Sequence, residues 1–101
     1  MLKTKITDGS TVAIKLTTGE EIIGRLVSQN EDSIIVKKPM AFLRMQQSMG
    51  LMPFMATPEP DAEIELPKRF IVVLTVCEKQ IASQYIETTS GIKLAKTDLN
   101  V

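Results

Sequence analysis

Few side chains in this sequence could carry out chemistry. There is one cysteine, Cys77, and no histidine. A nucleophilic cysteine needs a nearby base, and zinc sites are built from cysteine and histidine clusters. Phosphate-binding glycine motifs stand at strand-to-helix turns, whereas Gly19 and Gly24 fall in a predicted hairpin and a predicted strand. We therefore predict that the chain is not an enzyme and has no metal site or cofactor, with Cys77 as a small buried apolar side chain.

Carboxylates gather in one stretch, residues 58–66, which has four acids and no base: Glu59, Asp61, Glu63 and Glu65. Paired carboxylates can perform acid–base chemistry or bind a divalent metal. The acids Glu63 and Glu65 alternate with apolar residues, and such alternation is typical of a strand with one solvated face. We favour the solvated face, because no other ligand or nucleophile lies nearby.

Charge and length limit the classes of partner. Lysine plus arginine and aspartate plus glutamate each number 12, so the net charge is zero. This gives no support to a broad nucleic-acid-coating surface, but it is compatible with a local basic patch such as Lys68-Arg69. The 101 residues predict a single domain, 1–101, and the 44 % hydrophobic content favours a globular fold.

The expected setting is cytoplasmic. A lone cysteine is typical of a reducing compartment. The first ten residues contain no apolar run of signal-peptide length, and no stretch approaches the ~20 apolar residues of a membrane span. We predict a soluble intracellular protein, with no membrane partner.

The stretch Val12–Pro39 is the part of the chain around which the other predicted elements are arranged. Three apolar runs are separated by two polar turns, Thr17–Glu20 and Gln29–Ser33, which predicts three consecutive antiparallel strands. Gly24 lies inside the second strand, where a glycine normally marks a bend or a bulge; we expect a Cβ there to collide, and a ligand contact is the alternative. Pro39 cannot donate to a strand ladder, which predicts an edge or a bulge.

Residues 40–57 hold five of the six methionines and one charge, Arg44. A turn near Ser48–Gly50 predicts a hairpin. Either it prolongs the third and fourth strands and fills the core, or it forms an adaptable protein–protein surface. We favour the surface, because the segment is long and apolar for a domain of this size.

The remaining elements complete a β-β-β-β-β-α order. The fourth strand resumes near residues 63–66, and the fifth covers 70–74. Thr75 and Glu78 fit a capping box, which predicts a C-terminal helix over residues 76–90 that ends at Gly91. We expect residues 1–10 to form a loose arm, 11–76 the barrel and 91–101 a tail. The predicted fold is mainly β, a small, strongly bent, five-stranded antiparallel open barrel of the Sm-like or SH3-like kind with one C-terminal helix.

The pattern Val12-x-Ile14-x-Leu16-x-x-Gly19, followed by Gly24-x-Leu26 and Asn30, resembles the first motif of the Sm and Sm-like (LSm, Hfq-type) proteins. Departures are an Asn30 in place of the usual aspartate, an Ile34 in place of a base-reading asparagine, and a helix after the barrel instead of before it. The second motif is represented only by Lys68-Arg69. With its long hairpin, the chain looks most like the divergent Sm-like proteins encoded by phages.

This resemblance implies a homo-oligomeric ring of five to seven subunits that binds single-stranded RNA near its pore. Ring subunits of the family pair their fourth strand with the fifth strand of the next subunit. The implied RNA-binding candidates are Asn30, Glu31, Asp32, Ser33, Lys68 and Arg69. The implied interface candidates are Ile64, Leu66, Phe70, Ile71, Val72 and Val73, with Met52 and Phe54 from the hairpin.

Two hypotheses of different classes stay open. In the first, a ring concentrates two cations per subunit around a pore and binds RNA. In the second, a structural or adaptor ring binds other proteins through the Met-rich hairpin, consistent with the zero net charge and the acidic stretch 58–66.

Overall fold

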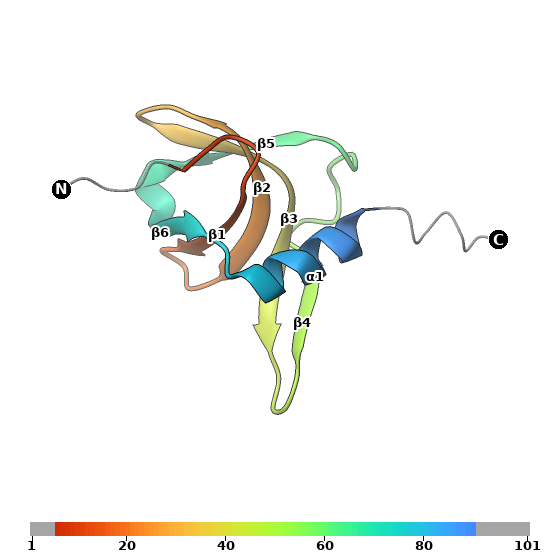
Figure 1. The fold of residues 1–101 in the computed structure, drawn as a ribbon. Coiled ribbons are helices and arrows are strands. Elements are labelled where there is room, and N and C mark those ends of the chain that lie inside the picture. The colour runs from red at the N-terminus through yellow and green to blue at the C-terminus, as the bar shows by residue number, and fades with distance from the viewer. Residues whose placement is uncertain (1–5, 91–101) are drawn as a thin grey trace.

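The computed structural model describes residues 6–90. It is mainly β, an antiparallel sheet that does not close, followed by one C-terminal helix (Figure 1). The helix is α1 (Lys79–Thr89), and a single 3-10 turn covers Lys68–Phe70. The strands are β1 (Thr11–Leu16), β2 (Glu21–Gln29), β3 (Ser33–Arg44), β4 (Met49–Pro53), β5 (Glu63–Pro67) and β6 (Ile71–Val76).

The sheet has one strand more than the predicted five, because an arm of the Met-rich hairpin is a strand of its own. The order is β4-β3-β2-β1-β6, and β5 also pairs with β3. The 12 residues of β3 serve two partners: Ser33–Lys37 pair with β5, and Met40–Arg44 pair with β4. Figure 1 shows the β3–β4 hairpin projecting away from the barrel.

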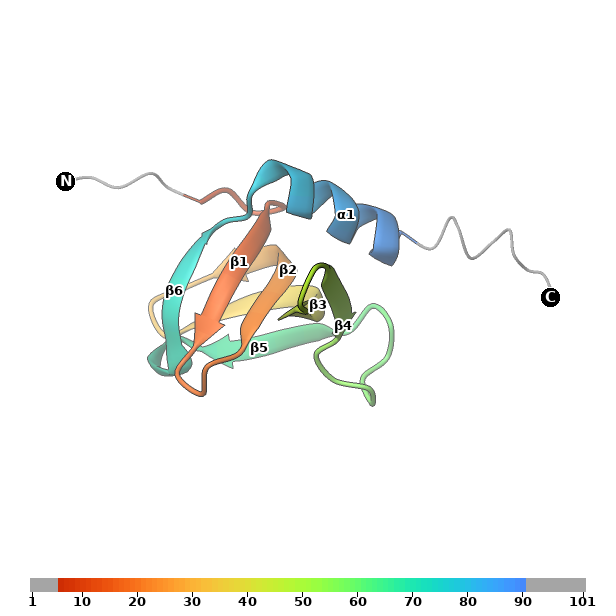
Figure 2. The same cartoon turned by 90° about the horizontal axis from the view of Figure 1, so that it is seen from below.

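Two apolar clusters lie on opposite faces of the sheet. The inner cluster consists of the buried residues Val12, Ile14, Leu16, Ile22, Leu26, Ile34 and Val36. It follows the predicted alternation, since side chains two residues apart share a face. The outer cluster consists of Ile23, Met40, Cys77 and Tyr85. Tyr85 belongs to α1, and this helix covers the cluster (Figure 2). The sheet is therefore apolar on both faces where α1 crosses it.

A bulge in β3 lies opposite Gly24. Ile23 pairs with Met40 and Arg25 with Lys37, so Gly24 faces two residues, Lys38 and Pro39. Lys38 has a φ of 50°, in the left-handed region that non-glycine residues seldom adopt. Of the two positions predicted for Pro39, an edge or a bulge, the structure shows the bulge. The expected collision at Gly24 is wrong, because an added Cβ would lie 3.5 Å from Val36 Cβ, an ordinary contact.

The helix begins later than the capping box predicted. β6 continues to Val76, which pairs with Val12, so Thr75 is a strand residue and not an N-cap. Glu78 is itself the N-cap: its side-chain oxygen accepts a hydrogen bond from the Ile81 N–H at 3.1 Å. The pairing of β6 with β1 therefore outweighed the local capping-box pattern of Thr75 and Glu78. The predicted helix end at Gly91 and the tail 91–101 lie outside the described residues.

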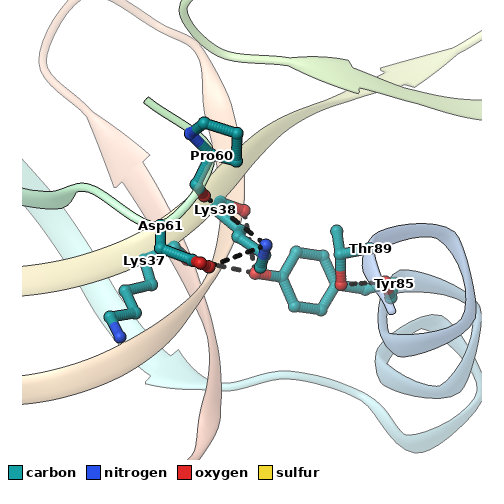
Figure 3. A network of polar contacts seen from close by, with 6 residues as sticks. All are labelled: Lys37, Lys38, Pro60, Asp61, Tyr85 and Thr89. Atoms are coloured by element: carbon teal, nitrogen blue, oxygen red, sulfur yellow. Dashed lines mark hydrogen bonds and ion pairs between the residues drawn. The ribbon is translucent and has the colours of Figure 1, made fainter. Parts of the chain in front are cut away.

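Tyr85 fixes α1 to the bulge (Figure 3). Its ring is 1 % exposed, and its hydroxyl donates to the Lys38 carbonyl at 2.8 Å, with the Lys37 carbonyl at 3.1 Å. On the other side of the bulge, Lys38 Nζ lies 3.2 Å from Asp61 and 3.4 Å from the Pro60 carbonyl oxygen. The bulge therefore connects β3, the helix and the loop before β5.

Stability should fall between about pH 10 and pH 12 because of Tyr85. Burial raises the pKa of this phenol from 10.0 to about 12. The unfolded chain loses the proton near pH 10 and the folded chain keeps it, so the folded state binds more protons in that window and becomes less stable as pH rises. Because Tyr85 is the sole tyrosine, absorbance near 295 nm reports its titration directly. Chemical denaturation of wild type and Tyr85→Phe across this range isolates the effect from lysine titration; parallel curves for the two proteins would contradict it.

The N-terminal arm is docked where it is described. Gly9 N–H donates to the Leu26 carbonyl at 2.7 Å, and Leu26 N–H donates to the Ser10 carbonyl at 2.8 Å. Ile6 packs against the inner cluster. The arm was expected to be loose, and from residue 6 onward it is not. Within residues 6–90, no helix is long and apolar enough to cross a membrane.

Candidate nucleic-acid interface

Two turns that are distant in sequence meet at one end of the sheet. Lys68 N–H donates to the Asp32 carbonyl at 2.7 Å, and Ser33 pairs with Pro67. The β2–β3 turn, Asn30–Ser33, is therefore in direct contact with the 3-10 turn Lys68–Phe70. All six predicted RNA-binding residues lie on these two turns.

Asn30 shapes its turn. Its side-chain oxygen accepts from the Asp32 N–H at 2.7 Å and from the Ser33 N–H at 3.0 Å. This is the local bonding by which asparagine stabilises turns. The oxygen is committed to the backbone, so the side-chain NH₂ is the group of Asn30 that can reach a base. Ser33 is buried and supports the turn from within.

The basic turn includes an aromatic ring that sequence reasoning did not assign to this site. Arg69 Cζ lies 4.7 Å from the centroid of the Phe70 ring, and Phe70 is 46 % exposed. An exposed ring next to a guanidinium can stack on a base. The sequence placed Phe70 in a strand because nothing in it signalled a 3-10 turn. The Phe70 carbonyl accepts from the Thr17 N–H at 2.8 Å, which anchors this turn to β1.

The charges at the two turns balance within one subunit. Lys68 is half-buried and Arg69 is exposed, while Glu31 and Asp32 are exposed carboxylates on the facing turn. A single subunit therefore offers a weak site for a polyanion. Cations repeated around a ring would bind cooperatively along one strand of nucleic acid.

The interface candidates separate into two groups. Ile64, Leu66, Ile71 and Phe54 are half-buried and pack against the inner cluster of their own subunit. Val72, Val73, Met52 and Phe70 are 62 %, 47 %, 47 % and 46 % exposed. The first group therefore packs within its own barrel, whereas the second group is exposed and available for contact with another chain.

The edge at β6 is apolar and uncovered. In the described part of the chain, β6 pairs only with β1, and β5 pairs only with β3. Val76 is opposite Val12 in the register and shares its face, yet Val76 is 54 % exposed whereas Val12 is fully buried. The inner face is therefore open on the β6 side, where a further strand would close it.

The remaining candidate side chains are Cys77 and the carboxylates of β5. Burial raises the pKa of the Cys77 thiol above 9.0, and the neighbouring carboxylates of Glu78 and Glu21 raise it further. This disfavours the thiolate. Glu63 and Glu65 are exposed on β5, as the alternation predicted. No group of three or more acidic or cysteine side chains within residues 6–90 could hold a metal ion.

Comparisons with known proteins leave the family open. No protein family matches the chain, and no curated protein matches it. Among solved structures, it is similar to a chain of the crystal structure of the NatC complex bound to CoA, with a TM-score of 0.49 and 19 % sequence identity. The match covers 84 % of this chain and 99 % of that one.

Proposed function

We propose that this protein is an Sm-like subunit of a homo-oligomeric ring of five to seven copies that binds single-stranded RNA. The observation that carries the proposal is the contact between the Asn30–Ser33 turn and the Lys68–Phe70 turn, made by the Lys68 N–H on the Asp32 carbonyl. It gathers an amide, two cations and an exposed ring in one place. These are the groups that bind phosphates and stack on unpaired bases.

Ring assembly is supported by the two free edges. β5 and β6 each have one unpaired side in the described chain. Exposed edge strands favour pairing with another chain, and head-to-tail pairing closes into a ring when the rotation allows it. Pairing β6 with the β5 edge of the next copy would cover Val72, Val73 and Val76. Each contact would use two different surfaces of the subunit, as a head-to-tail ring of five to seven copies requires.

The test of the proposal is the mass in solution, with and without oligouridylate and oligoadenylate, measured by light scattering. A mass of five to seven subunits that increases by the mass of one oligonucleotide supports both ring assembly and RNA binding. A monomer at micromolar concentration, with no binding at low salt, would contradict it.

Substituting the β6 edge should break the assembly. Val72→Lys together with Val73→Lys would bury two cations per contact, which should raise the dissociation constant between neighbours on the order of a hundredfold. The mass should fall toward that of the monomer. A control is Ile86→Lys, which introduces one cation at a residue of similar exposure, 50 %, that lies on α1. An unchanged mass for the double variant would remove β6 from the interface.

A second function, that of a protein-binding adaptor, is favoured by the projecting hairpin. Its exposed apolar residues are Leu43, Met45, Met49 and Met52, followed by Met55 just beyond β4. Methionine-rich surface adapts to varied partners. The two functions differ in co-purified nucleic acid: an absorbance ratio at 260 and 280 nm typical of clean protein, without oligonucleotide binding at low salt, favours the adaptor.

A further inference from the structure

A groove of about 590 Å³ has no lining residue in either turn of the proposed RNA site. It is bounded by the β1–β2 turn, the second half of β3 and the first turn of α1. Ile23 and Cys77 lie at its base, and Phe42, Leu43 and Ile81 form apolar walls. Its volume is within the range of ligand pockets, roughly 300–1,000 Å³.

The charges around this groove are mostly acidic. Among the residues that line it, Glu20, Glu21 and Glu78 are carboxylates and Arg44 is the one cation. All four are exposed. The field of Glu78 and Glu21 reaches the base of the groove, where both carboxylates add to the effect of burial in raising the pKa of Cys77.

This charge pattern selects the class of occupant. Carboxylates repel the phosphates of nucleic acid and of anionic lipid, whereas they attract lysine and arginine. The apolar walls require an apolar side chain between those cations. Glu78 already accepts from the Ile81 N–H, but a carboxylate has two oxygens and can take a second donor.

We propose that the groove docks a short segment of a partner protein in which one or two apolar side chains are flanked by lysine or arginine. The apolar side chains contact Phe42, Leu43 and Ile81, and the flanking cations pair with Glu20, Glu21 and Glu78. The groove shares no residue with the two turns of the RNA site. The proposal therefore stands whether or not the chain binds RNA.

The experiment is an NMR titration of the full ¹⁵N-labelled chain with an amidated hexapeptide of alternating leucine and lysine. We expect saturable shifts of the Phe42, Leu43 and Ile81 amides. Glu20→Lys together with Glu21→Lys should weaken binding about tenfold, because two exposed attractions become repulsions. The control is Glu59→Lys with Glu87→Lys, which makes the same charge change at exposed sites outside the groove and should alter affinity less than twofold.

Two further peptides test the separate parts. Replacing leucine by serine should abolish the shifts, and replacing lysine by glutamate should do the same. Equal binding of either peptide, no shifts up to millimolar concentration, or shifts confined to residues outside the groove would each overturn the proposal.

Discussion

Lys68→Ala combined with Arg69→Ala should weaken oligonucleotide binding by the proposed ring at least about a hundredfold at low salt. The reason is multiplicity, since every subunit loses both cations of its basic turn. The slope of log affinity against log salt should fall by about 0.7 for each phosphate that the variant no longer neutralises. Filter binding or fluorescence anisotropy from 50 to 300 mM salt measures both quantities.

The control for this variant removes two exposed lysines outside the basic turn, Lys15→Ala with Lys79→Ala, on β1 and α1. It makes the same change in net charge and should reduce affinity only a few-fold. Nanomolar binding that survives the Lys68 and Arg69 substitutions would show that the RNA site lies elsewhere. Light scattering on both variants checks that assembly is unaffected.

Tyr85→Ala should lower the free energy of unfolding by roughly 3–5 kcal/mol. The ring is 1 % exposed between α1 and the sheet, and removing it leaves a cavity and two carbonyls without their donor. A domain of this size is stable by about 5–15 kcal/mol, so the variant should be partly unfolded near physiological temperature. Urea denaturation followed by far-ultraviolet circular dichroism measures the change.

Two further variants separate the contribution of the Tyr85 hydroxyl from that of the ring, and the buried side of α1 from its exposed side. Tyr85→Phe keeps the ring and should cost about 1–3 kcal/mol, the range for leaving a buried acceptor unpaired. Gln84→Ala, on the exposed side of the same helix, should change stability by less than about 0.5 kcal/mol. A loss below about 1 kcal/mol in Tyr85→Ala would mean that α1 is not fixed to the bulge through this residue.

The inner half of the fold was predictable from the sequence because one rule governs it. Val12, Ile14 and Leu16 alternate with polar or small residues, and that period places them on one face in any antiparallel arrangement. The hairpin turns were predictable for the same local reason. Only the family resemblance implied that the Asn30–Ser33 turn and the Lys68–Arg69 turn belong to one site, and the structure places these two turns in contact.

The parts that were missed depend on long-range pairing. Thr75 and Glu78 satisfy a capping rule, but pairing of Val76 with Val12 draws Thr75 into β6. The hairpin forms a sixth strand because β3 continues through the bulge and offers a second edge to β4. A local sequence pattern shows neither that β6 pairs with β1 nor that β4 pairs with β3. Phe70 was assigned to a strand for the same reason, since its 3-10 turn is held by Thr17, 53 residues earlier along the chain.

The bulge at Lys38–Pro39 has a consequence for how the chain tolerates changes in length. A slip of β3 by one residue would reverse the facing of every side chain along it. Pro39 lacks an N–H donor and Lys38 has a left-handed backbone, so a shifted β3 could not place other residues at the bulge without strain. The bulge therefore fixes the register of β3 in the part of the strand that belongs to the barrel. Insertions or deletions at the tip, around Gln46-Gln47, would therefore be absorbed within the hairpin, and that tip is a natural position for a peptide graft.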